Sequence, residues 1–600
     1  MKASRRILFS LLITLAICLP LSWPLPKMMS DTMPWGATKR MEPPAELSPM
    51  IPGDHIQFLY YMLLANDFIA GQTPLFYNLY EFNTGNDEAR YSPGSYYLPF
   101  SLAFSVFHLF GTPAFAWNAS IFLAAWLAYL FTWLLALRYT SREGIAATAA
   151  LFALLLPFQW VQLFGGSPAG FGMVMIPLLL LGIDRAVRDD QFSGGLIAGI
   201  AIFFASCTDT HVFFFGALLI PVWCIVAFTQ RASFNWQRPA AYWRLTRALA
   251  PLLILAILAL LQTQIGTDSI QETASSAGRT IGEVKLFSPR WQGLWAWRSI
   301  NVTDQIYLGY IITALLALGG FTLTTRAIRA RRGVAMQRGF LFALVCVGIA
   351  GTVALAMGPF GPFRGKLFAL VRDLVPNYEM IRQPAKIFVI LPALLGIGAA
   401  LTLDAVVEAR PRLPRWLLPV LGLLIAAEYY SQTRVSLSRI SDTNTAYAAV
   451  AQDAQTRAKK ARAMVLPLWP GDSHFASIYQ YYSMLYRIRM INGYSPFVPT
   501  EYIEGVFDRY ETLNLGYASE QQLDQLLSLG IDHLLLHEDL YPEKSQRVPD
   551  RHSAFRVAEQ SAHRPTATGR PGVGLSNPSD RRSARTGCNQ LEFLFPRQPP

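Results

Sequence analysis

Apolar stretches of about 20 residues recur along this 600-residue chain, and short turns that carry Arg or Lys separate many of them. A helix of that length spans a bilayer, where every backbone polar group must be satisfied internally. Hydrophobic residues make up 52% of the chain and charged residues only 15%, with a mean hydropathy of +0.29. The sequence therefore predicts a polytopic α-helical membrane protein with about eleven transmembrane helices. They are expected to start near Ile7, Phe115, Ile145, Ala169, Gly195, Val212, Leu249, Ile306, Phe340, Ile387 and Trp416.

Basic residues indicate how these helices are oriented. The net charge of +12 comes largely from cations at the ends of apolar stretches, so we expect no nucleic-acid partner. The apolar segment 96–110 is ambiguous, because most loop cations would fall outside the cell if it crossed the bilayer. We therefore expect an interfacial helix or re-entrant hairpin there. The N-terminus is then cytoplasmic, and the first loop (27–114) and the region after the last span lie outside.

The chain changes character after the transmembrane domain, which we place at 1–435. Segments 463–468 and 531–536 are typical of buried strands, and 480–486 and 520–529 are typical of helices. We expect a small extracytoplasmic α/β domain at 440–543. From 544 to 600 the sequence is rich in Arg, Ser, Pro and Gly, which predicts a disordered tail.

A carboxylate opens the helical pattern of the first outer loop, in the run Ile51-Pro-Gly-Asp54. A helix from Asp54 to Ala70 would place Asp54, Gln57 and Tyr61 on one face. A carboxylate there suits a general base, and it equally suits a helix N-cap. The neighbouring His55 is expected either to bind a phosphate or sugar hydroxyl or to be solvated.

Other acidic groups share the outer side. Asp209 and His211 occupy a short outer turn and are expected to join Asp54 in one site. Glu81, Asp87 and Glu88 offer a second carboxylate, although their surroundings favour a flexible turn. The sequence contains no recognised metal-binding spacing, so we predict no metal and no cofactor.

Two outer loops are exceptions to the excess of Lys and Arg that the cytoplasmic loops otherwise show. One loop contains Arg279, Lys285, Arg290 and Arg298, and another contains Arg364, Lys366, Arg372, Arg382 and Lys386. Such groups would bind the phosphate of a lipid carrier, or otherwise anionic lipid headgroups.

Three short motifs accompany this pattern: Tyr91-Ser-Pro-Gly-Ser-Tyr-Tyr97, Met380-Ile-Arg-Gln-Pro-Ala-Lys386 and Ile491-Asn-Gly-Tyr-Ser-Pro496. With the aspartate of the first loop and the outer α/β domain, they resemble the GT-C membrane glycosyltransferases. Among these, the chain is most similar to bacterial membrane proteins of the YfhO type.

The resemblance implies sugar transfer from a polyprenyl-phosphate-linked donor to an envelope glycan, lipid or protein, on the extracytoplasmic face of a bacterial inner membrane. Asp54 would be the catalytic base of an inverting reaction, and Arg382 and Lys386 would hold the departing phosphate. The remaining residues expected to bind substrate are His55, Gln57, Asp209, His211, Arg364 and Lys366. Two alternatives stay open, a carrier or flippase for lipid-linked glycans and a non-catalytic envelope-assembly protein.

Overall fold

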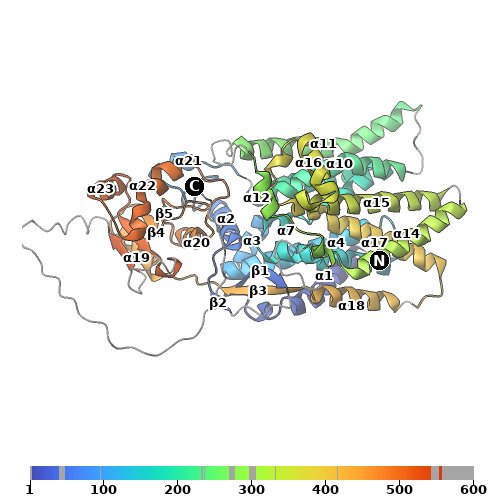
Figure 1. The fold of residues 1–600 in the computed structure, drawn as a ribbon, viewed down its shortest axis with the longest axis horizontal. Coiled ribbons are helices and arrows are strands. Elements are labelled where there is room, and N and C mark those ends of the chain that lie inside the picture. Colours follow the sequence, from blue (N-terminus) through green and yellow to red (C-terminus); the bar gives the residue numbers. More distant parts are fainter. Residues whose placement is uncertain are drawn as a thin grey trace, which may run out of the picture.

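The chain folds into a long helical bundle with an α/β domain at one end (Figure 1). The computed structural model describes residues 3–39, 47–94, 96–231, 234, 237–268, 278–295, 306–330, 333–414, 416–541 and 553–556. Within them, eight helices are long and apolar enough to cross a membrane. These are α1 (Ala3–Leu21), α4 (Pro113–Ala136), α7 with α8 (Pro168–Asp189), α10 (Thr210–Thr229), α11 (Pro239–Asp268), α14 (Tyr310–Ala330), α15 (Val334–Ala356) and η7 with α17 (Pro384–Ala409).

The other three expected spans are shorter or broken. A bend of 51° separates α5 (Glu143–Leu155) from α6 (Pro157–Phe164), because Pro157 has no N–H with which to continue the helix. Helices α9 (Phe192–Thr208) and α18 (Leu417–Tyr430) are apolar but short. Each predicted span therefore coincides with an apolar helix or a bent pair, and the chain is a multi-pass membrane protein.

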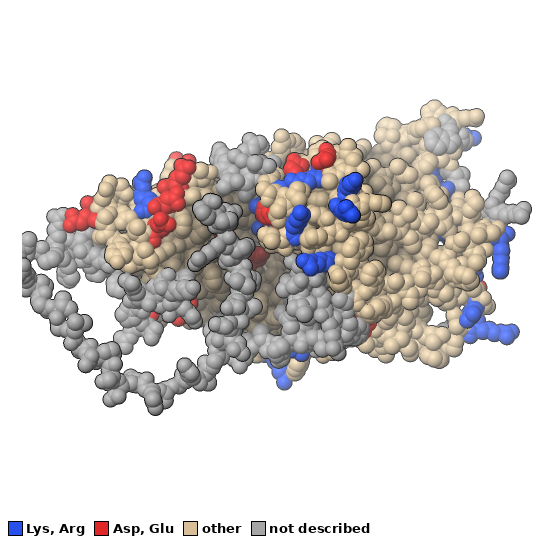
Figure 2. Space-filling view, viewed as in Figure 1, with Lys and Arg blue, Asp and Glu red and all other residues tan. Residues whose placement is uncertain are grey.

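Ion pairs join several helix ends at the end of the bundle that holds the N-terminus. They connect α1, the turn between α4 and α5, α8, α14, α15 and α17, whose loops the sequence assigns to one side of the membrane. Figure 2 shows Lys and Arg at this end, on the right. These pairs are Arg6–Glu143, Arg138–Asp184, Arg142–Asp404, Arg326–Glu408 and Arg338–Glu408.

The ambiguous apolar segment forms α3 (Phe100–His108), which packs against α2 (Asp54–Ile69) and α4. Nine residues of helix rise only about 14 Å, too short to cross a bilayer. The side chains of Leu102, Val106, Leu109 and Phe110 are exposed on its outer side. This arrangement agrees with the predicted interfacial helix.

Two small sheets organise the other end. The first has the order β1 (Thr32–Lys39), β3 (Thr433–Arg439), β2 (Ser48–Pro49), so it joins the first outer loop to the chain that leaves α18. The domain boundary expected at 435–440 therefore runs through β3.

The second sheet forms the core of the α/β domain, in the order β5 (Arg489–Met490), β4 (Arg462–Leu466), β6 (His533–Leu536), β7 (Ser553–Arg556). Strands β5, β4 and β6 are parallel, and β7 is antiparallel to β6. Both predicted strands are present, and the domain's helices are α19 (Thr445–Thr456), α20 (Ala476–Tyr486), α21 (Thr500–Tyr502), α22 (Asp508–Tyr510) and α23 (Glu520–Ser528). Strand β7 corrects the expectation of disorder within 544–600, because its backbone pairs with the edge of β6; the rest of that tail lies outside the described residues.

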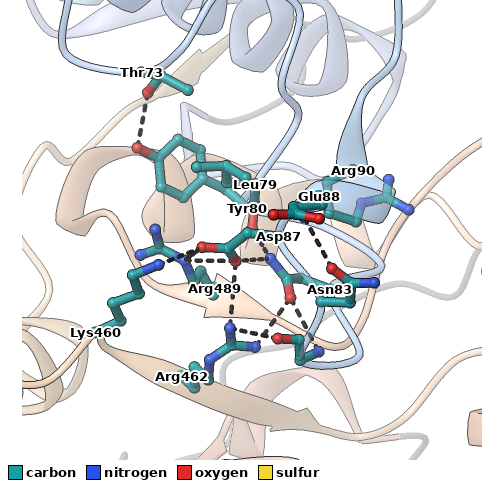
Figure 3. A network of polar contacts seen from close by, with 12 residues as sticks. Thr73, Leu79, Tyr80, Asn83, Asp87, Glu88, Arg90, Lys460, Arg462 and Arg489 are labelled. Carbon is teal, nitrogen blue, oxygen red and sulfur yellow. Dashed lines mark hydrogen bonds and ion pairs between the residues drawn. The ribbon is translucent and has the colours of Figure 1, made fainter.

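An ionic cluster fastens the first outer loop to the α/β domain (Figure 3). The carboxylate of Asp87 accepts hydrogen bonds from Arg489 at 2.9 Å and Lys460 at 2.8 Å, and it pairs with Arg462 at 3.3 Å. Asn83 donates to the same carboxylate at 3.0 Å. The prediction of a flexible turn at residues 83–88 is wrong for this reason, since three cations from another part of the chain hold it.

Candidate active site

Asp54 is the first residue of α2 (Asp54–Ile69), which lies between the bundle and the α/β domain (Figure 1). The N-cap position belongs to Gly53, so Asp54 is not the helix N-cap. Its side chain is exposed, and its Oδ1 accepts a hydrogen bond from the Tyr494 hydroxyl at 2.5 Å. No hydrogen bond to Oδ2 occurs among the described residues. The carboxylate is therefore held by one oxygen and open at the other.

Tyr494 is itself fixed from several sides. Its carbonyl accepts hydrogen bonds from Gln57 Nε2 at 2.5 Å and from Gln480 Nε2 at 3.0 Å. Its backbone N–H lies 3.4 Å from a carboxylate oxygen of Glu81. Asp54 and Gln57 thus use one face of α2, as predicted, to hold the same tyrosine. Gln57 positions Tyr494 in this structure.

The local sequence explains how Tyr494 reaches α2. Asn492 brackets the backbone of Val465 on β4, accepting from its N–H at 2.7 Å and donating to its carbonyl at 2.8 Å. Phe82 donates its backbone N–H to the carbonyl of Asn492 at 2.8 Å. A Cβ on Gly493 would lie 2.4 Å from the Phe82 ring, so only glycine fits between them. The motif at residues 491–496 therefore joins the first outer loop to the sheet of the α/β domain and directs Tyr494 toward Asp54.

Glu81 is buried and does not offer an accessible second carboxylate. It accepts hydrogen bonds from Tyr61 at 2.9 Å, from Asn78 at 2.5 Å and from Gln480. Burial raises the pKa of Glu81, while the charge of Arg90 and these hydrogen bonds oppose that rise. The group joins α2, the first outer loop and α20.

Two cations, Lys386 and Arg382, share the electrostatic surroundings of Asp54. Lys386 donates from Nζ to Gln162 Oε1 at 2.6 Å and to Ser167 Oγ at 2.9 Å, which leaves one ammonium hydrogen for a ligand. The charges of Asp54, Asp209 and Arg382 all act on Lys386.

Arg382 is available for an anion. Its guanidinium lies 4.6 Å from the centre of the Phe287 ring, and its charge acts on Tyr494 as well as on Lys386. No hydrogen bond or ion pair of this guanidinium occurs within the described part of the chain. The charges of Asp54 and Arg382 thus both act on Lys386 and on Tyr494, and we treat these three charged residues as one group.

Asp209 reaches this group from the turn between α9 and α10. It is the N-cap of α10 and accepts hydrogen bonds from the backbone N–H of His211 at 2.9 Å and of Val212 at 3.0 Å. Burial would raise the pKa of Asp209, but His211 and Lys386 lower it to about 2. The His211 Nδ1 lies 3.4 Å from Asp209 Oδ1. Asp209 is thus an ionised N-cap whose negative charge offsets the positive charge of Lys386.

His55 is not at the surface of the site. It is 2% exposed, and burial lowers its pKa to about 3, so the ring is neutral. A Cβ on Gly166 would lie 2.4 Å from the His55 Cβ, and Gly166 has a φ of +70° that favours glycine. The sequence predicted that His55 binds substrate or is solvated. In the structure, His55 packs instead against Gly166, in the loop whose Gln162 and Ser167 accept hydrogen bonds from Lys386.

Arg364 and Lys366 are exposed around η5 (Pro362–Gly365) and the start of α16 (Lys366–Leu374). Within the described residues, no contact joins either of them to Asp54. The apolar side chains of Phe363, Leu370 and Leu374 are also exposed there. Cations beside exposed apolar groups suit a membrane surface. These two residues therefore lie apart from the Asp54 group.

Sequence reasoning missed Tyr97 and Tyr494 as members of the site. The Tyr97 ring lies 4.2 Å from that of Phe58, and the charges of Asp54 and Asp209 act on it. Both tyrosines stand inside motifs visible in the sequence, but nothing in the motifs shows what they contact. Among the described residues, no three or more His, Cys, Asp or Glu side chains lie together in a way that could hold a metal ion.

No family model and no curated protein matches the chain. Among solved structures, the arabinofuranosyltransferase AftD from Mycobacteria is similar at 18% identity and a TM-score of 0.49, over 92% of this chain and 36% of that one. The chain thus spans about a third of that protein's length. The oligosaccharyltransferase of Archaeoglobus fulgidus is similar at 13% identity and a TM-score of 0.41, over 89% of this chain and 68% of that one.

A third similar structure is ArnT from Cupriavidus metallidurans bound to undecaprenyl phosphate, at 12% identity and a TM-score of 0.35, over 89% of this chain and 86% of that one. The likeness of all three to this chain is distant.

Proposed function

We propose that this protein is a glycosyltransferase that moves a sugar from a polyprenyl-phosphate-linked donor to an acceptor at the extracytoplasmic face of a bacterial inner membrane. The observation that carries the proposal is the group formed by Asp54, Lys386 and Arg382. Asp54 is an exposed carboxylate with one oxygen that no described residue contacts, and its charge acts on Lys386 and Tyr494 together with that of Arg382. Lys386 and Arg382 both retain hydrogen-bond donors for a ligand. A base beside phosphate ligands is what such a transfer needs.

The reaction is a single displacement. The acceptor hydroxyl oxygen bonds to the anomeric carbon, and its proton passes to Asp54 Oδ2. The bond from that carbon to the phosphate oxygen breaks, and the departing polyprenyl phosphate keeps the electron pair. Arg382 and the third hydrogen of Lys386 stabilise the developing negative charge, and the anomeric configuration inverts.

Tyr494 orients the base. Its hydroxyl donates to Asp54 Oδ1, so the free Oδ2 stays directed away from the tyrosine. A charge-assisted hydrogen bond of this length is a strong one and restrains the carboxylate in one rotamer. The C-terminal domain therefore completes the proposed site.

The test is transfer by the purified protein in liposomes that contain undecaprenyl-phosphate-linked hexoses or pentoses together with a bacterial envelope extract. The measured product is free undecaprenyl phosphate. We expect Asp54→Asn to slow its release about 10²–10⁴-fold, the range of a general base. Asp524→Asn, an exposed aspartate on α23, is the matched control.

Wild-type release by Asp54→Asn would show that Asp54 is not the base. Movement of labelled lipid across the bilayer without any sugar release would instead identify a carrier.

A further inference from the structure

The loop that follows β4, residues 467–475, lies at the carboxyl end of the parallel strands. Ligands of parallel sheets collect at this edge. The segment that leaves β5 and carries Tyr494 emerges at the same edge, and Ser495 N–H donates to the Gly471 carbonyl at 2.8 Å. The loop therefore lies next to the tyrosine that holds Asp54.

Three aromatic rings stack in this loop. The Phe475 ring lies 5.0 Å from that of Trp469 with an interplanar angle of 22°, and 4.4 Å from that of His474 with an angle of 29°. The His474 and Asp472 side chains are exposed, and the other two rings are half-buried. The charge of Asp54 acts on His474.

Two further interactions link the loop and the helix after it to Asp54 and Tyr494. The charges of Asp54 and Asp472 act together on Tyr494. Just after the loop, on α20, Ser477 Oγ accepts the N–H of Gly53, which directly precedes Asp54, at 3.0 Å. The stack and the proposed base therefore surround Tyr494.

The loop is held in place by the domain beneath it. Asn514 accepts the Leu468 N–H at 2.6 Å and donates to the Leu468 carbonyl at 2.8 Å. The Tyr502 hydroxyl donates to the Trp469 carbonyl at 2.8 Å. A loop fixed before its ligand arrives loses little entropy on binding.

Such a surface matches the chemistry of a sugar ring, which has an apolar C–H face and a rim of hydroxyls. The negative face of an aromatic ring attracts the C–H groups, and a carboxylate accepts hydroxyl hydrogens. We propose that residues 467–475 bind a carbohydrate acceptor, with Trp469 and His474 as its platform, Phe475 as the ring on which both stack, and Asp472 as its hydroxyl acceptor. This inference rests on the proposed transferase and names its acceptor as a glycan. An acceptor hydroxyl beyond the platform then meets Asp54 Oδ2.

Glycan binding is measured without any donor, by saturation-transfer NMR on the full-length protein in detergent. The probes are soluble gluco-, manno-, galacto- and arabino-oligosaccharides. At least one series should bind, and Trp469→Ala should weaken it about 10-fold, as expected for the loss of one aromatic platform. Trp469→Phe, which keeps a ring, should retain most of the affinity, and Asp472→Asn should weaken it several-fold.

The matched control is Tyr517→Ala. This aromatic residue is 65% exposed in a shallow hollow of about 790 Å³ elsewhere on the same domain, lined also by Arg509 and Gln522. Its binding should equal that of wild type. The proposal is overturned if no series binds, or if Trp469→Ala binds as tightly as the wild type.

The result is independent of the base. Glycan binding is measured on the wild-type protein without any donor, so a failed transfer assay leaves the subsite standing. Conversely, transfer to a lipid or a protein by a chain that binds no glycan would remove the subsite and keep the transferase.

Discussion

Mild acid should destabilise the start of α2 through His55. The unfolded chain binds a proton here below pH 6.5, whereas the folded protein keeps the ring neutral down to about pH 3. The folded-state pKa is depressed, so the full stability is present above pH 6.5 and is lost as the pH falls toward 3. Between pH 8 and pH 5 the loss is about 2 kcal/mol, since each pH unit inside this window costs about 1.4 kcal/mol.

The assay is the apparent melting temperature of the purified protein in detergent at the two pH values. We expect a decrease on the order of a few degrees for a chain of this size. Hydrogen exchange should rise first in residues 162–167, because Gly166 of that loop packs on His55.

Two variants make the experiment decisive. His55→Gln cannot take up a proton in this range and should flatten the pH dependence. His108→Gln, which changes a partly exposed histidine at the end of α3, should keep it. An equally steep acid loss in His55→Gln and in the wild type would refute the reasoning.

Three further outcomes follow from single contacts. Gly166→Ala places a Cβ 2.4 Å from His55 at a φ of +70°, and should lower stability by about 2–4 kcal/mol, measured by thermal unfolding. Asp87→Asn removes the charge that joins the outer loop to three cations, and should cost about 1–3 kcal/mol and speed proteolysis of residues 83–88. Tyr494→Phe deletes the hydroxyl on Asp54 and should lower kcat of transfer about 10- to 100-fold with little change in KM for the donor; an unchanged kcat would show that Asp54 needs no orienting partner.

The sequence determined the membrane architecture. An apolar run of about 20 residues can satisfy its backbone in lipid only as a helix, so each span follows from local composition. The same holds for β4 and β6, whose short apolar runs are flanked by helical patterns. The loop charges also predicted that 96–110 does not cross the bilayer, and α3, at nine residues, is too short to do so.

The site depended on the tertiary structure. Asp54 and Tyr494 are 440 positions apart, and no local pattern predicts that one would hold the other. The predictions for His55 and Asp87 were wrong for the same reason. A histidine beside a helix start and an Asn-Thr-Gly-Asn turn suggest a solvated ring and a flexible loop, but distant residues bury the one and pair with the other. Composition determines which segments enter the bilayer or a protein core. The partner of a polar side chain depends instead on how distant segments pack, and that packing exists only in the folded chain.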